Sequence, residues 1–198
     1  MEESDSKDQC RRKPKNEVHR LKDMTKLILI PVLVFSSLFA GLAGNWNIDE
    51  DYAIKFSTAK AEGTLTGLTG TIVFDEEDLS TASFNVSVDA TSIKTGSKMK
   101  DKHARGKSWL YTTVYSEITF ESTAFKATDS GYTVTGDLSI RGVTKSVDIP
   151  FTFRENIGVG LFEGTTTILR EDYGIDGPFL FSKLVGDEIE VSLRVPVK

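Results

Sequence analysis

Residues 131–153 (GYTVTGDLSIRGVTKSVDIPFTF) constrain the fold of this chain more than any other stretch. Side chains on a β-strand alternate between two faces, and here apolar and polar residues alternate on both sides of a central turn. Gly142 supplies the backbone freedom that a tight turn needs, and Pro150, which lacks an N–H donor, indicates an edge or a bulge. We therefore predict a hairpin whose apolar face is made by Val134, Gly136, Leu138, Ile140, Val147, Ile149, Phe151 and Phe153.

Similar alternation predicts six more strands, over residues 46–58, 62–75, 83–92, 117–126, 161–170 and 188–198. The strand over 62–75 contains Gly63, Gly67 and Gly70, which predict a sharp bend or a close approach of something bulky. The strand over 117–126 is expected to place on one face Ile118, Phe120, Ser122 and Ala124.

A short helix interrupts this series between the third and fourth strands. Ser97 is its expected cap, Arg105 its last residue, and Gly106 its stop. Eight antiparallel strands and one short helix indicate an all-β sandwich or barrel. A closed barrel has no free edge, and eight strands enclose either packed side chains or one small ligand.

The apolar segment Leu27–Ala43 follows Met24 and Lys26 and ends in small residues, so residues 24–43 are expected to be a signal peptide cleaved near Ala43. Its alternative is an uncleaved inner-membrane anchor through Leu27–Ala43, although 17 residues are short for a span. Residues 1–23 form a polar extension, either a mis-called start or a cytoplasmic tail. Residues 44–198 form the expected domain, which contains no cysteine and so no disulfide.

The expected domain is acidic, with 16 Lys and Arg residues against 23 Asp and Glu, a net charge of about −7. We therefore expect no nucleic-acid partner. Its one basic island consists of Lys98, Lys100, Lys102, Arg105 and Lys107. Two interpretations stay open for this island: a solvated helix face, or a contact for an anionic head group or a membrane surface.

His103 is the only histidine of the expected domain, and a metal site needs several converging ligands. A hydrolase built on His103 would also need a nucleophile and an orienting acid, which the sequence does not reveal. The chain has no G-x-S-x-G or H-E-x-x-H motif, and Asp75–Asp78 lacks the spacing of a calcium loop. We expect neither an enzyme nor a cofactor or metal.

Several segments in order resemble the YceI-like family. The most specific is Gly136–Lys145, GDLSIRGVTK, which is similar to the family's G-D-L-T-I-R-G-V-T-K hairpin. Further matching segments are Trp46–Asp49, Ile72–Asp75, Ala90–Gly96, Lys100–His103, Ile118–Ser122 and Arg170–Ile175. The last of these carries Tyr173 where the family has phenylalanine. Departures also fall at Asp51-Tyr52 and Lys60, where the family has an H-S pair and often a histidine, and at Trp109–Tyr111 and Tyr115-Ser116.

This resemblance implies a lipocalin-like barrel, usually periplasmic, that holds a polyisoprenoid or similar amphiphilic lipid. The expected apolar lining is Phe84, Val86, Phe120, Leu138, Ile140, Ile149, Phe151 and Ile168. The expected head-group side is His103, Trp109 and Arg105, and ligand choice is expected to depend on Lys98–Tyr111 and Phe179–Phe181. The alternatives are a stress-related or partner-binding barrel with a filled core, and a hydrolase using His103.

Overall fold

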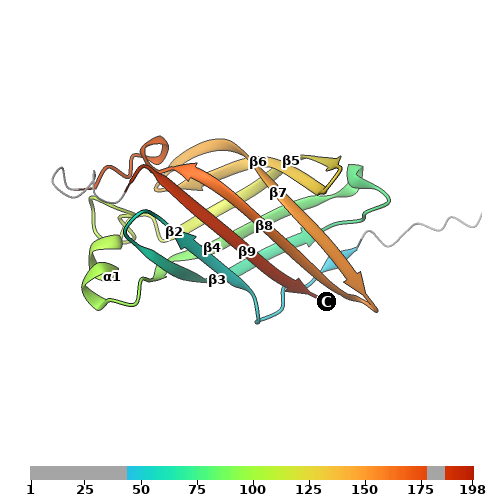
Figure 1. Cartoon of the computed structure of the whole chain (residues 1–198), viewed down its shortest axis with the longest axis horizontal. Helices are drawn as coiled ribbons and strands as arrows, with labels where there is room; N and C mark the ends of the chain where they lie inside the picture. The colour runs from blue at the N-terminus through green and yellow to red at the C-terminus, as the bar shows by residue number, and fades with distance from the viewer. Residues whose placement is uncertain (1–43, 178–185) are drawn as a thin grey trace, which may run out of the picture. The chain divides into compact units, whose positions relative to one another are not determined.

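The alternating segments pair into one antiparallel sheet that closes on itself. The computed structural model describes residues 44–177 and 186–198, so the predicted polar extension and signal peptide lie outside the described residues. In that part of the chain the strand order is β1-β3-β2-β9-β8-β7-β6-β5-β4, and β3 also pairs with β4 (Figure 1). The strands are β1 (Asn45–Trp46), β2 (Ala53–Ser57), β3 (Glu62–Val73), β4 (Ser83–Lys94), β5 (Glu117–Thr128), β6 (Gly131–Ile140), β7 (Val143–Asn156), β8 (Val159–Leu169) and β9 (Glu188–Val197).

Pairing of β3 with β4 makes β2 to β9 an eight-stranded barrel, as predicted. The two-residue strand β1 lies outside this ring and pairs with the end of β3, where Trp46 is opposite Ile72. The helix α1 (Lys98–Ala104) lies between β4 and β5, the predicted place. Figure 1 shows α1 at one end of the barrel and the C-terminus, which follows β9, at the other.

The prediction of one strand over residues 46–58 is wrong. A turn separates β1 from β2, because the Asp49 carboxylate accepts a hydrogen bond from the Asp51 N–H (3.3 Å). Lys198 donates to the same carboxylate (2.8 Å), and Ile48 forms a bridge with Val197. The chain therefore bends to meet the C-terminal end of β9 before it enters the barrel.

The predicted faces of the hairpin are correct, since Val134, Ile140, Ile149 and Phe151 are all buried. The predicted face of β5 is correct only as far as Ser122. A bulge between Ser122 and Ala124 shifts the register against β6, so Phe125 joins the core and Ala124 is exposed.

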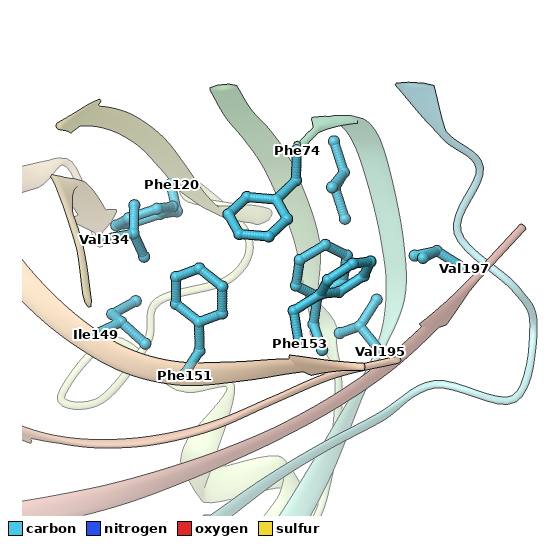
Figure 2. Close-up of a cluster of buried hydrophobic side chains, with 10 residues drawn as sticks. Phe74, Phe120, Val134, Ile149, Phe151, Phe153, Val195 and Val197 are labelled. Carbon is cyan, nitrogen blue, oxygen red and sulfur yellow. The ribbon is translucent and has the colours of Figure 1, made fainter. Parts of the chain in front are cut away.

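Aromatic rings fill the end of the barrel that lies away from α1 (Figure 2). Phe74 is only 1% exposed and is the centre of this aromatic cluster. Its ring centroid lies 5.1 to 6.2 Å from those of Phe84, Phe125, Tyr132, Phe151, Phe153 and Phe162. Edge-to-face pairs of this kind add about 0.5–1.5 kcal/mol each beyond the burial of their surface. This end is therefore a packed core.

A gap in the sheet lies between β7 and β8 near the α1 end. Their pairing runs only from Phe151 to Asn156 on β7, so it begins immediately after Pro150. The 3-10 helix η2 (Arg170–Tyr173) packs against β7, and Tyr173 joins a second buried cluster with Ile140, Ile168 and Ile175. Residues 143–150 of β7 pair only with β6 and so form a local edge, and Pro150 lies at the end of that edge, as the sequence predicted.

The hairpin turns at the two ends of β7 both use two residues with positive φ, the geometry of a type I′ turn. Arg141 and Gly142 join β6 to β7 with φ values of 53° and 75°. Ile157 and Gly158 join β7 to β8 with φ values of 52° and 74°. Positive φ is sterically costly for a β-branched residue, and the Ile157 side chain is 95% exposed, so no burial offsets that cost.

Replacing Ile157 with Asn is expected to stabilise the domain, because Asn-Gly is the preferred type I′ pair. The expected gain is about 1 kcal/mol, or roughly 2–4 °C in Tm for a domain of this size. Thermal unfolding measures it, with Val159→Asn as the control, since Val159 is exposed but has no positive φ. An unchanged or lower Tm for Ile157→Asn would contradict the strained turn.

Replacing Tyr173 with Phe is also expected to raise the stability. Tyr173 is 2% exposed, and within the described part of the chain its hydroxyl has no hydrogen-bond partner. Burial also raises the pKa of Tyr173, and the nearby Asp172 adds to that shift. Removing an unpaired buried hydroxyl is expected to stabilise by about 1–3 kcal/mol in a denaturant titration, whereas a loss of stability would reveal a partner for the hydroxyl.

Candidate functional site

A cavity of about 1060 Å³ occupies the α1 half of the barrel. Inward-facing side chains of all eight barrel strands line it. Its floor is the aromatic cluster, because Phe84, Phe151 and Phe162 belong to both. At the other end it reaches exposed side chains of α1, so the cavity opens there. Its volume is at the upper end of the range of about 300–1,000 Å³ for small-molecule sites.

All eight residues of the predicted apolar lining face this cavity, together with His103 and Trp109 from the predicted head-group side. The structure thus brings these ten residues around one space, whereas their contact with a ligand stays a prediction. The eight are Phe84, Val86, Phe120, Leu138, Ile140, Ile149, Phe151 and Ile168.

Arg105, the third residue of the predicted head-group side, does not line the cavity. Its guanidinium Nη1 donates to the carbonyl oxygens of Thr91 (3.3 Å) and Ile93 (3.2 Å) on β4. Arg105 therefore fastens the end of α1 to the barrel wall.

The sequence interpretation missed the walls made by β2, β3 and β9. These include Ile54, Phe56, Leu65, Leu68, Ile189, Val191, Leu193 and Val195. On β9 the two-residue alternation was visible, and it would have placed all four of its residues inside. The interpretation also left out Lys60, which lines the mouth from the turn between β2 and β3. Phe179–Phe181 lies outside the described residues.

Asp101 ties α1 to the end of β4. Its Oδ1 accepts hydrogen bonds from the backbone N–H and the hydroxyl of Thr95, both at 2.7 Å. The hydroxyl bond, and then the N–H bond, hold the pKa of Asp101 below its ordinary value of 3.8. Ser97 is the N-cap as predicted, but its side chain makes no capping bond, so Asp101 provides the local anchor instead.

The segment that follows α1 is held at the cavity mouth by contacts from two distant turns. Arg141 donates from Nη2 to the carbonyl oxygen of Lys107 (2.9 Å). The Gly177 N–H donates to the carbonyl oxygen of Ser108 (2.9 Å). A Cβ on Gly177 would lie 2.8 Å from the Trp109 ring, so glycine is what allows the indole to pack there.

His103 is exposed, and across residues 44–177 and 186–198 no group of three His, Cys, Asp or Glu side chains is arranged to hold a metal ion. The predicted Asp75–Asp78 turn bonds to itself, since Asp75 accepts from the Glu77 N–H and Asp78 from the Ser80 N–H. Over the same residues, no helix has the length and apolar character needed to span a bilayer.

Comparison with known proteins places the chain among relatives of one kind. A model of the YceI-like domain matches residues 46–197. Protein YceI of Shigella flexneri is 33% identical over 129 residues, which cover 59% of this chain and 68% of that protein. A UPF0312 protein of Ectopseudomonas mendocina is 31% identical over 172 residues, which cover 77% of this chain and 88% of that protein.

Solved structures show the same barrel. BcnA of Burkholderia cenocepacia superimposes with a TM-score of 0.72 at 24% identity, covering 77% of this chain and 100% of that one. A polyisoprenoid binding domain from Saccharophagus degradans superimposes with a TM-score of 0.59 at 14% identity, covering 78% and 97%. At these identities the likeness shows a shared fold.

Asp101→Ala is expected to loosen α1 and lower the Tm at neutral pH. A carboxylate whose pKa is depressed on folding stabilises the fold above its unfolded value and loses that effect as pH falls through the folded value. The Tm difference from the unmodified protein should therefore be full at neutral pH and shrink as the pH drops below 3.8. Asp129→Ala, in the turn between β5 and β6, is the matched control. A difference that stays constant down the acid range would contradict the role of the carboxylate charge.

Proposed function

The chain belongs to the YceI-like domain family, and we propose that it is an exported binding protein that holds an isoprenoid-type lipid inside its barrel. The observation that carries this proposal is the cavity of about 1060 Å³, which has an aromatic floor and an opening beside α1. The polyisoprenoid binding domain of Saccharophagus degradans, which shares the fold, supports the choice of ligand class.

The cavity suits a long apolar tail because its strand-derived walls are mostly aliphatic and aromatic. Each methylene moved out of water contributes about 0.8 kcal/mol, so about ten of them contribute roughly 8 kcal/mol before ordering costs. The barrel strands surround the tail, and η2 packs beside the stretch where β7 and β8 do not pair. A branched isoprenoid chain has no hydrogen-bonding groups, and wall residues such as Leu68, Val88 and Leu138 have none in their side chains.

The two alternative functions have less support from the geometry. A barrel with a filled core is expected to lack an internal space, and this one has a cavity. A hydrolase needs His103 to orient a nucleophile. Among the described residues no hydrogen bond joins the His103 side chain to a hydroxyl or a carboxylate.

Export is part of the proposal and rests on the sequence around Leu27–Ala43. Cleavage after Ala43 would release residues 44–198 as a free carrier in the periplasm or outside the cell. An intact N-terminus would instead leave the barrel attached to the membrane through Leu27–Ala43.

Native mass spectrometry of the protein purified from its own host tests ligand and export together. The expected result is the mass of residues 44–198 plus a bound lipid, which organic extraction identifies as a prenyl compound. Protein that arrives empty and takes up no prenyl lipid from a supplied mixture would refute the carrier function. The polypeptide mass separately reports whether cleavage occurred.

Filling the cavity provides a second arm of the same test. Val88 lines the cavity from β4, so Val88→Trp is expected to occupy tail space and weaken lipid uptake about tenfold or more. Asn85→Trp is the matched control, because Asn85 is an exposed residue of the same strand that does not line the cavity. Equal uptake by the two variants, both with an unchanged Tm, would show that the lipid binds elsewhere.

A further inference from the structure

The charged side chains that line the cavity are nearly all cationic. Among residues 44–177 and 186–198 they are Lys60, Lys100, Lys102, Lys107 and Arg170, against one carboxylate, Glu163. Glu163 forms an ion pair with Arg154. Arg170 is buried and bonds to Asp187 (2.6 Å) and to the carbonyl oxygens of Ile175, Asp176 and Gly186. These contacts leave the four lysines as the charges directed at the cavity.

The four lysines, here called the mouth lysines, come from two separate segments. Lys60 lies in the turn between β2 and β3, which is held closed by Thr58, whose N–H and hydroxyl donate to the Ala61 carbonyl (2.7 and 2.9 Å). Lys100 and Lys102 lie on α1, and Lys107 follows it. Within residues 44–177 and 186–198, no mouth lysine forms an ion pair.

Helical spacing supports a directed rather than a random arrangement. Lys100, His103 and Ala104 all line the cavity, and their i, i+3, i+4 spacing is that of a single helix face. The residue before this face, Met99, is 68% exposed and does not line the cavity. The helix is therefore turned with the face that carries Lys100 toward the opening.

The acidic residue nearest in sequence forms no ion pair with the mouth lysines. Asp101 lies between Lys100 and Lys102, but its Oδ1 accepts both hydrogen bonds from Thr95. A cluster of like charges at the mouth of an otherwise acidic domain carries a repulsion that a bound anion relieves. Lysine ammonium groups bind phosphate oxygens as compact point charges.

From these observations we propose that the mouth lysines select ligands whose head group is a phosphate or diphosphate ester. This proposal rests on the proposed function, which accounts for the apolar tail of the lipid, and it adds the chemical class of the head group. The tail lies against the apolar walls, and the phosphate oxygens accept hydrogen bonds from Lys60 on one segment and from Lys100, Lys102 and Lys107 on the other.

The test compares geranylgeraniol, geranylgeranyl phosphate and geranylgeranyl diphosphate, which share one tail, by calorimetric titration. The phosphorylated lipids are expected to bind about tenfold more tightly than the alcohol, and raised salt should narrow the difference. In the triple variant Lys100→Gln, Lys102→Gln, Lys107→Gln this preference should fall to about twofold or less, while affinity for the alcohol stays unchanged. Lys60→Gln alone should reduce the preference for the phosphorylated lipids by a smaller factor.

The control variant is Lys55→Gln, Lys126→Gln, Lys145→Gln, which changes the net charge equally at lysines that do not line the cavity. It is expected to keep the preference for phosphate. If it loses the preference as the triple mouth variant does, net charge alone is responsible and the proposal is overturned.

The remaining outcomes separate this proposal from the proposed function. If the unmodified protein binds the alcohol and the phosphate equally, the head-group proposal is overturned and the proposed carrier function is not. If it binds none of the three lipids, the proposed carrier function is overturned, and the head-group proposal with it. Inorganic diphosphate binding as tightly as the prenyl diphosphate would indicate a site for a free anion. If the mouth variant keeps its lipid preference but no longer binds phosphatidylglycerol vesicles, the lysines contact a membrane and the proposal is wrong.

Discussion

The packing of aromatic rings around Phe74 is the interaction on which the rest of this barrel depends. Residues 44–198 contain no cysteine, so no disulfide holds the sheet closed. Six rings surround Phe74 at one end, where β1 and the end of β9 also join. Because this end supplies a dense core, the other end can remain open without the loss of a cooperative fold. The packed core and the proposed binding site thus lie in opposite halves of the same strands.

The open half is stabilised by hydrogen bonds at its rim and by the second buried cluster around Tyr173, not by a core that fills its centre. The Asp101 carboxylate accepts hydrogen bonds from Thr95, and the Arg105 guanidinium donates to two backbone carbonyls of β4. The Arg141 guanidinium donates to the backbone carbonyl of Lys107. The Arg141-Gly142 turn, the segment most typical of the family, therefore does more than set the register of β6 and β7. It also positions the chain that carries a mouth lysine and Trp109, so hairpin geometry and the shape of the opening are linked.

Local alternation predicted most strands and the inward faces of β6 and β7, because side-chain direction on a strand depends only on neighbouring residues. It failed wherever a distant contact decided the outcome. The bulge beside Ala124 depends on register with β6, and the break before β2 depends on Lys198 reaching Asp49. Glycines in β3 did indicate the bend, since register shifts against β4 flank Gly67, whose φ is 76°. Alternation alone could not predict the cavity, because inward faces do not give the volume between them. The family resemblance did imply an internal lipid site, but it marked Lys60 only as a departure from a family histidine and not as part of the mouth.

Under the proposed function, a barrel that is filled at one end and open at the other carries its ligand but does not let it pass through. The rings of Phe84, Phe151 and Phe162 close the cavity at its floor, so a ligand would enter and leave through the one opening beside α1. A long amphiphile then goes in tail first and comes out head first, and it never reverses inside. Under the proposed function, uptake and release therefore use one opening, and the ligand keeps one orientation for as long as it is bound.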